Sequence, residues 1–399
     1  MIPVAEARAR ILDGLRPTET EIVHLAEAWD RVAAMPLAAR VTQPPQDVSA
    51  MDGYALRAAD GVDGARLRIV GTAPAGHPWA GTLAPGEALR LFTGSVMPAG
   101  ADAVLLQEDA SDADGLVTVR EQVIAGRHVR RAGQDFAAGD VLIAAGRRLA
   151  ARDVGLAASG NLPWLAVHRR PRVAILATGD EIALPGEPIP PGGIVSSNAH
   201  ALAAFVRANG AEPLVLPIAA DDPDVIAAAA SVPADLLVTT GGASVGAHDL
   251  VREGLGRRGL RVDFWKIAMR PGKPLMFGRM GAMPVLGLPG NPVSALVCAV
   301  LFLHPALARL AGLPDAAPPT ETARLGAPLP ANDRRADHLR ARLATGADGT
   351  FVATAFDRQD SALLRLFTQA DALILREPHA AAAQAGAPVG IIRLSALGI

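Results

Sequence analysis

Residues 171–312 alternate short apolar runs with segments of helical periodicity. The apolar runs cover residues 173–177, 214–218, 236–239 and 284–288, and helical segments cover residues 198–209, 222 onward, 250–255 and 292–311. Local signals agree with these boundaries: Ser197 can cap one helix, Gly210 can end it, and Asp222-Pro223 is typical of a helix start. Strands that alternate with helices predict a mostly parallel, doubly wound sheet.

The regions on either side follow other patterns. Residues 3–14 and 19–35 show helical periodicity, with Thr18 and Glu21 spaced as in a capping box. Short β-rich runs at 67–71, 88–92, 103–107 and 116–119 are separated by Gly, Pro and Asp, and Asp153 can cap a short helix ending near Gly160. We expect an α/β and β multidomain protein with an interrupted N-terminal helical and mixed domain (residues 1–40 plus 141–168), a β insertion module (41–140), the doubly wound α/β domain (169–312) and a C-terminal β domain (313–399).

Composition excludes several classes of function. A net charge of −2, the absence of a basic run and an aromatic content of 4% argue against nucleic acid as the main ligand. The N-terminus has the pattern of an amphipathic helix and not of a signal peptide, and the apolar run 293–303 is shorter than the roughly 20 residues that a membrane span needs. Cys298 is the only cysteine, which favours a buried, unreactive thiol and a cytoplasmic protein that binds no membrane.

Unusual residues follow the strands of residues 171–312, where open α/β sheets bind their ligands. After successive strands come Thr178, Gly179 and Glu181; then Asp221; then Gly241, Gly242 and Ser244, with Asp249 beyond them; then Lys266, Arg270 and Lys273; and finally Pro289, Gly290, Asn291 and Pro292. Each group has an ordinary explanation as a turn or a helix cap, but together they predict one site at one edge of the sheet.

The chemistry of these groups indicates an anion. Lys266 and Lys273 are the only lysines, and they lie with Arg270 in one Pro- and Gly-rich loop, which indicates an oxyanion site. The loop at 241–246 is either a tight turn or an anion cradle, and Gly290-Asn291 is either a plain strand-to-helix turn or an anion site at a helix start. The carboxylates suit Mg²⁺ bound together with phosphate, although each of them singly can be a helix cap. The histidines show no zinc-ligand spacing.

The β module adds polar clusters of its own. Asp52 and the only tyrosine, Tyr54, share one turn, and Thr93 and Gly94 lie in a hydroxyl-rich loop. A separate module has no obvious way to aim these groups at the sheet edge within one chain, so a second subunit could supply them.

Several segments resemble the MoeA family, the molybdopterin molybdenumtransferases, whose animal relative is the E domain of gephyrin. The resemblance is carried by SAMDGYAL (49–56), TGSVMPAGADAVLLQE (93–108), RRAGQD (130–135), LATGDEI (176–182), SSN (196–198), TTGGASVGAHD (239–249), WKIAMRPGKP (265–274) and GLPGNPVSA (287–295). It implies a MogA-like molybdopterin-binding α/β domain and a homodimer whose active-site cleft forms between subunits.

The resemblance also implies a reaction: molybdate is inserted into adenylylated molybdopterin, with release of AMP and with Mg²⁺ assisting. The implied functional residues are Asp52, Thr93, Glu181, Asp221, Asp249, Lys266 and Lys273, with Arg270 where some members have lysine and Ser361 matching a serine of the C-terminal domain. Glu181 and Asp221 would hold Mg²⁺, and an adenylyltransferase partner could deliver the pterin. The alternatives are a molybdopterin adenylyltransferase and a non-catalytic scaffold like gephyrin.

Overall fold

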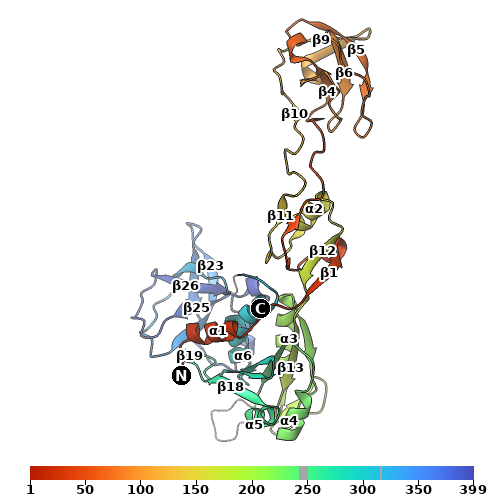
Figure 1. The fold of residues 1–399 in the computed structure, drawn as a ribbon. Helices are drawn as coiled ribbons and strands as arrows, with labels where there is room; N and C mark the ends of the chain where they lie inside the picture. Colours follow the sequence, from red (N-terminus) through yellow and green to blue (C-terminus); the bar gives the residue numbers. More distant parts are fainter. Residues whose placement is uncertain (242–249, 315–316) are drawn as a thin grey trace.

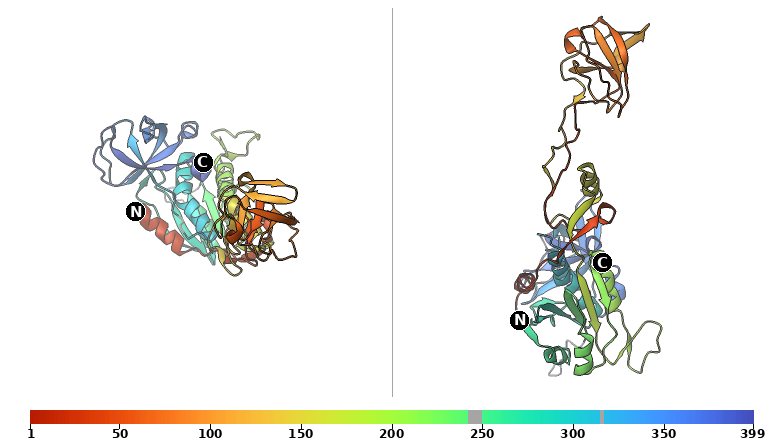
Figure 2. Two further views of the ribbon diagram at one scale, coloured as in Figure 1. Left: turned by 90° about the horizontal axis from the view of Figure 1, so that it is seen from above. Right: turned by 45° about the vertical axis from the view of Figure 1, so that its right-hand side comes forward.

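The computed structural model describes residues 1–241, 250–314 and 317–399. The molecule is elongated (Figure 1). The β module lies at one end, two extended segments connect it to a small mixed module, and the α/β and C-terminal domains lie together at the other end. Figure 2 shows the same separation from a second direction.

The α/β domain is built on a six-stranded sheet of order β16-β13-β17-β21-β20-β18. Its parallel strands are β13 (Arg172–Ala177), β16 (Glu212–Val215), β17 (Leu236–Thr240) and β21 (Met283–Leu288), and β20 (Met276–Met280) and β18 (Leu260–Trp265) are antiparallel additions. The predicted doubly wound, mostly parallel sheet is therefore confirmed.

Helices cover both faces of this sheet. One face packs against α3 (Asn198–Ala208) and a continuous helical run made of α6 (Pro292–Cys298), η4 (Ala299–Leu303) and α7 (His304–Leu310). The other face packs against α4 (Pro223–Ala229) and α5 (Leu250–Arg257). In β13, Val173 and Ile175 face the first core and Ala174 and Leu176 face the second, as the two-residue period of a strand requires.

Helix caps in this domain match the sequence. Asp222 accepts hydrogen bonds from the Asp224 and Val225 amides at 2.7 and 3.3 Å, and Pro223 occupies the first turn of α4. Gly210 follows α3 with φ of 78°, a conformation that glycine adopts at little cost. The predicted cap at Ser197 makes no side-chain capping hydrogen bond.

Two expectations for the N-terminal region are wrong. Residues 19–35 are not a helix, because β1 (Thr20–His24) pairs antiparallel with β12 (Trp164–His168) and only η1 (Leu25–Glu27) is helical. Thr18 does not form a capping box, since its hydroxyl donates to the Arg169 carbonyl at 2.5 Å. The β-branched side chains of β1 favour a strand once a partner strand is present, and that partner lies far along the chain.

Helix α1 (Val4–Asp13) lies outside the N-terminal module to which the sequence assigned it. Ala7, Ile11 and Leu15 are buried in the same core as α3 and α7, so this helix belongs to the α/β domain. The remaining small module combines β1 and β12 with β2 (Leu37–Ala38), β11 (Val141–Ile143) and the expected helix α2 (Ala151–Ser159). In α2 the Asp153 carboxylate accepts from the Ala150 amide at 2.9 Å.

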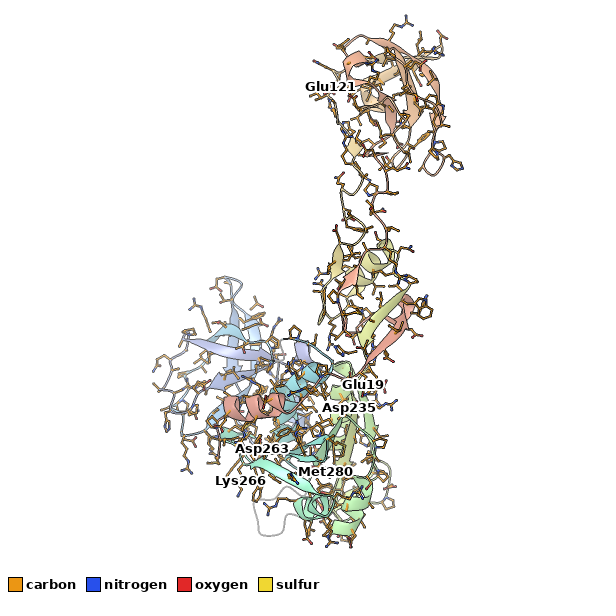
Figure 3. The ribbon with its side chains drawn as sticks, viewed as in Figure 1. Glu19, Glu121, Asp235, Asp263, Lys266 and Met280 are labelled. Atoms are coloured by element: carbon orange, nitrogen blue, oxygen red, sulfur yellow. The ribbon has the colours of Figure 1, made fainter. Side chains whose placement is uncertain are left out.

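Arg169 joins this small module to the α/β domain. Its guanidinium donates to Glu19 at 2.8 Å and to Asp235 at 2.9 Å, and Figure 3 shows these two acids at the junction of the modules. The hydrogen bond to Asp235, foremost, raises the pKa of Arg169 above its ordinary value. The hydrogen bonds between Arg169, which follows β12, and Asp235, which precedes β17, therefore connect the small module to the central sheet.

The β module is a six-stranded sheet of order β7-β4-β6-β5-β9-β8. Its strands are β4 (Gly53–Leu56), β5 (Arg66–Ala73), β6 (Glu87–Leu91), β7 (Ala103–Leu106), β8 (Ala110–Ala113) and β9 (Leu116–Val119), which confirms each predicted run. The two connecting segments run antiparallel, held by β3 (Val48–Ser49) against β10 (Val129–Arg130) and by a bridge between Gln43 and Phe136.

The C-terminal domain closes a small barrel. Its sheet order is β19-β23-β24-β22-β26-β25, and β25 also pairs with β23. Its strands are β22 (Glu321–Leu325), β23 (Ala336–Thr345), β24 (Phe351–Ala355), β25 (Ala372–Arg376) and β26 (Pro388–Arg393), with one short helix, α8 (Leu364–Phe367). The added strand β19 (Met269–Arg270) comes from the loop that follows β18 in the α/β domain and carries Lys266, Arg270 and Lys273, here called the cationic loop. It pairs parallel with β23.

Within the described ranges, one helical run, Pro292–Leu310, has the length and hydropathy that could cross a membrane, and 89% of that stretch is buried inside the protein. It is the core helix formed by α6, η4 and α7. Cys298 lies in it, fully buried as predicted, and burial raises the pKa of its thiol.

Candidate functional site

A cavity of about 710 Å³ lies at the carboxyl ends of β13, β17 and β21. Its walls are formed by Ala177, Glu181, Ile182, Ile194, Val195, Ser196, Ser197, Asn198, Thr240, Gly241, Pro274, Pro289, Gly290, Asn291, Pro292, Ser294, Ala362 and Leu364. The structure thus brings together Glu181, Gly241 and the segment Pro289–Pro292, which the sequence placed at one sheet edge. Gly242, Ser244 and Asp249 lie outside the described residues.

Close backbone approach explains the glycines at this edge. Gly241 has φ of 92°, and a β-carbon there would lie 2.4 Å from the Thr178 carbonyl oxygen. Gly179 has φ of 141°, and a β-carbon there would lie 2.5 Å from the Glu181 carboxylate. Only glycine fits either position. The Glu181 side chain folds back over Gly179 as a result, and Thr178 is buried beneath the cavity.

The start of α6 carries a contact from the C-terminal domain. The Asn291 amide group donates to the Ser361 hydroxyl at 3.0 Å, and the Val293 amide donates to the Ser361 carbonyl at 3.1 Å. Ser361 therefore lies beside Asn291 of the cavity wall, and its functional role stays a prediction. The Val293 amide, one of the helix-start amides that could bind an anion, therefore already donates to the Ser361 carbonyl.

Asn198 is a site residue that the sequence analysis did not select. Its amide donates to the Thr240 hydroxyl at 2.8 Å and to the Gly290 carbonyl at 2.7 Å, so it links the ends of β17 and β21. The segment SSN at 196–198 was the available signal, because the first residue of α3 must project from the carboxyl edge of a doubly wound sheet.

Carboxylates gather beside the cavity. The Asp221 amide donates to Asp180 at 3.0 Å, which brings these two acids together near Glu181. Asp221 is solvent-exposed, and partial desolvation, followed by the negative charges of Asp180 and Glu181, raises its pKa. Among the residues that can be described, no three or more acidic, histidine or cysteine side chains converge on a metal position. Carboxylate oxygens are the donors that hard cations such as Mg²⁺ prefer.

The three basic side chains of the cationic loop have different surroundings. Lys266 directly follows β18, has φ of 84°, and places its ammonium group 4.1 Å from the centre of the Trp265 ring. Lys273 is exposed and precedes Pro274 of the cavity wall. Arg270 instead makes two hydrogen bonds to Asp337, at 2.9 and 2.5 Å, so its guanidinium faces the C-terminal barrel. The three cations expected to act together are therefore not equivalent.

Asp52, Thr93 and Gly94 form one corner of the β module. Asp52 accepts from the Thr93 amide at 2.7 Å and from its hydroxyl at 2.8 Å, and these bonds lower the pKa of Asp52. Gly94 has φ of 84°, which allows this tight turn. Within one chain the corner lies far from the cavity, at the other end of the molecule (Figure 1).

Comparison with known proteins gives consistent matches along the chain. Residues 2–160 match the model for the MoeA N-terminal region (domain I and II), residues 174–309 match a probable molybdopterin binding domain, and residues 322–394 match the MoeA C-terminal region (domain IV). A molybdopterin molybdenumtransferase of Haemophilus influenzae is 33% identical over 397 residues, 98% of each chain. One from Nostoc is 38% identical over 78% of this chain and 75% of its own. The crystal structure of a molybdopterin biosynthesis MoeA protein from Pyrococcus horikosii superposes with a TM-score of 0.85 at 28% identity, covering 98% of this chain and 99% of its own.

Proposed function

The chain belongs to the MoeA family of molybdopterin molybdenumtransferases, and we propose on that premise that it transfers molybdate to adenylylated molybdopterin, releases AMP and yields molybdenum cofactor. The observation that carries the finer proposal is the cavity at the carboxyl edge of the sheet. Glu181 and the start of α6 lie in its wall, Pro274 of the wall directly follows Lys273, and the C-terminal barrel borders one side through Ala362 and Leu364.

The charged groups match the reaction's demands. Molybdate and the phosphoanhydride are both anionic, so bringing them together requires positive charge that is already in place. Lys273, next to Pro274 of the cavity wall, and Lys266 in the same loop would supply it, while Gly241 and Asn291 would contact the pterin-bearing part of the substrate. The sulfur nucleophiles come from the pterin itself, so the protein's task is to position and neutralise.

Glu181 and Asp221 are the residues that would hold Mg²⁺. The raised pKa of Asp221 supports this assignment, because partial desolvation and then the neighbouring negative charges disfavour its ionised form, and a bound cation would offset both. When bound, Mg²⁺ would orient phosphate and molybdate oxygens and accept their charge. Asp249 is proposed to orient ligands beside them.

The active protein is proposed to be a homodimer in which each cleft takes residues from both chains. The Asp52, Thr93 and Gly94 corner is ordered by its own hydrogen bonds, yet it lies at the far end of its own chain from the cavity. A partner subunit can bring that corner over the sheet edge. We further propose a cytoplasmic location. The substrate would come from an adenylyltransferase, because the reaction starts from adenylylated molybdopterin.

The direct test is an assay with purified protein, adenylylated molybdopterin and molybdate. AMP release that depends on molybdate is the expected result. Transfer of AMP onto free molybdopterin would identify an adenylyltransferase, and pterin binding without any AMP release would identify a scaffold. Either outcome would overturn the proposal.

A further inference from the structure

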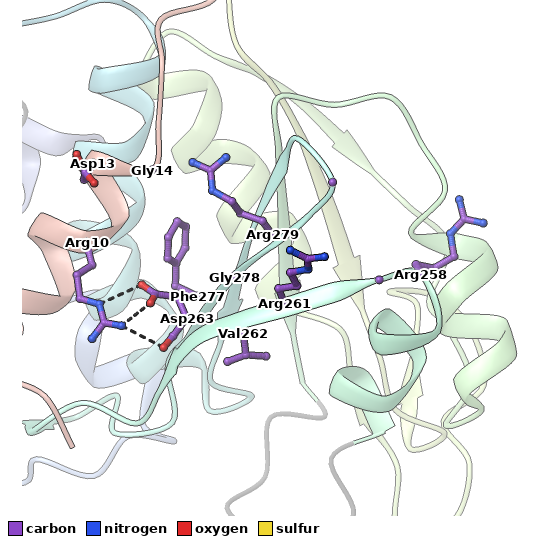
Figure 4. Close-up of a pocket in the computed structure, with 12 residues that line it drawn as sticks. Arg10, Asp13, Gly14, Arg258, Arg261, Val262, Asp263, Phe277, Gly278 and Arg279 are labelled. Atoms are coloured by element: carbon purple, nitrogen blue, oxygen red, sulfur yellow. Dashed lines mark hydrogen bonds and ion pairs between the residues drawn. The ribbon is translucent and has the colours of Figure 1, made fainter.

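A second cavity, of about 830 Å³, lies between α1 and the strands β18 and β20 (Figure 4). It is separate from the substrate cleft. The two cavities share no wall residue. Lys266 follows the last residue of β18, whereas Arg261 at the second cavity lies five positions earlier, near the start of that strand, roughly 15 Å away along it.

Three arginines dominate this cavity: Arg258 in the turn before β18, Arg261 on β18 and Arg279 on β20. Figure 4 shows Arg261 and Arg279 on the same side of the two strands and Val262 on the other side, with Arg258 beyond the start of β18. Arg261 and Arg279 are direct cross-strand partners in the antiparallel ladder. Like charges in that arrangement destabilise a sheet, so the pair costs the free protein stability.

Counter-charges do not explain the cluster. Across the described part of the chain, no carboxylate lies within 4.0 Å of any of the three guanidinium groups. Arg10 also lines the cavity, but Asp263 accepts its hydrogen bonds, one of them at 3.0 Å. Asp13 is the remaining acid on the wall, which leaves three arginines facing one aspartate.

Protection of a sheet edge does not explain the cluster either. Charged residues on an edge strand discourage pairing with other chains, and β18 is the edge strand. Arg279, however, is on β20, which is paired on both sides. An inner strand has no exposed edge to protect.

The cavity is open enough to admit an anion. Gly259 and Gly281 lie in its wall, and a β-carbon at either position would have no atom within 4 Å, so side chains leave this space open. Phe277 is only 3% exposed, so the floor offers no aromatic face on which a base could stack. The recognition elements are guanidinium groups, whose planar forks bind phosphate through paired hydrogen bonds.

We propose that Arg258, Arg261 and Arg279 form a binding site for a phosphate-bearing anion, distinct from the substrate cleft and additional to the transferase reaction. Binding there would neutralise the opposed arginine pair, which couples occupancy of the site to the stability of the sheet edge and of α1 beside it.

The test uses the full-length protein and inorganic pyrophosphate as the probe, titrated by calorimetry at low salt. The variant Arg261→Gln/Arg279→Gln is expected to bind pyrophosphate at least about tenfold more weakly than the natural protein, a change worth roughly 1.4 kcal/mol. Arg66→Gln is the matched control, because Arg66 is an exposed strand arginine of the distant β module. Its affinity should not change.

Two further measurements separate the explanations. Lys273→Ala should retain pyrophosphate binding; if it loses binding while the double arginine variant keeps it, the probe occupies the substrate cleft and the proposal is wrong. Without ligand, the double variant should melt at a higher temperature than the natural protein, and pyrophosphate should raise the melting temperature of the natural protein only. Equal affinity of the natural protein and the double variant for pyrophosphate would contradict an anion site. Absence of binding to either protein would also contradict it and would favour an acidic protein partner for the arginines.

Discussion

Lys266 and Lys273 stand out because arginine is used at every other basic position of the chain. Lysine presents a compact ammonium group, whereas guanidinium binds carboxylates through a planar fork. Arg270, between them in sequence, follows that rule: Asp337 binds it through two hydrogen bonds. The loop therefore separates two lysines available to an oxyanion from one arginine committed to a neighbouring domain.

Replacing Lys273 with alanine should lower molybdate-dependent AMP release about 10²- to 10³-fold, the usual loss when one preorganised charge-stabilising group is removed. Because the side chain is exposed, the free energy of unfolding should change by less than about 0.5 kcal/mol. Rates and urea unfolding curves are measured on the same preparations, with Arg66→Ala as the control. A variant that keeps its full rate would remove Lys273 from the proposed site.

Asp221 makes a prediction about pH and Mg²⁺. Its pKa is raised in the folded protein, first by partial desolvation and then by Asp180 and Glu181, so the ionised carboxylate is less favourable there than in the unfolded chain. Stability from this group is present at acid pH and is lost as pH rises from the unfolded to the folded pKa. Asp221→Asn should therefore raise the melting temperature at neutral pH and not at strongly acid pH.

Mg²⁺ should reverse that ranking. Bound metal stabilises the natural protein by about 2.7 kcal/mol at a hundred times its dissociation constant, and the asparagine variant should lose most of this gain. Calorimetric scans with and without MgCl₂ measure both effects, and Asp222→Asn serves as the control because that acid caps α4. An equal response to Mg²⁺ in natural and Asp221→Asn protein would rule out a ligand role for Asp221.

Strand β19 shows how a short segment can belong to two domains. Met269 and Arg270 lie in the cationic loop of the α/β domain, yet they pair parallel with Ala336 and Asp337 of the C-terminal barrel. The Asp337 side chain is 9% exposed, so its charge depends on Arg270 for compensation. A second contact also joins the barrel to the α/β domain: Asn291, at the start of α6, donates a hydrogen bond to the Ser361 hydroxyl.

Asp337→Ala should destabilise the protein by about 1–3 kcal/mol. Arg270 would lose both hydrogen bonds, and its partly buried guanidinium would be left without those acceptors. Urea unfolding measures the loss, and Arg334→Ala, an exposed arginine of the same domain, should change the free energy of unfolding by less than about 0.5 kcal/mol. In a double-mutant cycle with Arg270→Ala, a coupling energy near zero would show that the pair contributes nothing.

The overall shape separates the two halves of the proposed cleft. Paired extended segments, crossing from Gln43 to Phe136 and from Val48 to Arg130, hold the β module away from the α/β domain. Asp52 and Glu181 therefore lie in different parts of an elongated chain. The proposed dimer turns that separation into a requirement, because each cleft would need one half from each subunit.

Mixed dimers test this arrangement. Asp52→Ala and Glu181→Ala homodimers should each be nearly inactive, and a heterodimer of the two contains one cleft with both natural residues. Unfolding and refolding the two variants together should therefore restore up to about a quarter of the natural activity, the value expected when half the dimers are mixed and each has one intact cleft. Activity that stays at the level of the separate variants would place the whole cleft within one chain.

Much of the fold could be predicted because its signals are local. The cap at Asp222, the glycine after α3 and the alternating burial of β13 each depend on a few neighbouring residues, and all agree with the sequence. The convergence of Glu181, Gly241 and Asn291 followed from one topological rule, that parallel strands end at a common edge. The prediction of a helix at residues 19–35 was wrong for the same reason: it used local signals, and the strand at 164–168 that pairs with residues 20–24 is distant in the sequence.

Other features depended on partners distant in the chain. Periodicity cannot show that α1 is buried with the α/β domain, that Asp337 engages Arg270, or that Arg261 faces Arg279. A side chain's charge and residue type are written in the sequence, but the groups it meets depend on how separate elements pack. Salt screens exposed charges from one another beyond about 8–10 Å, so the packing that decides which charges are neighbours also decides which remain available to a ligand.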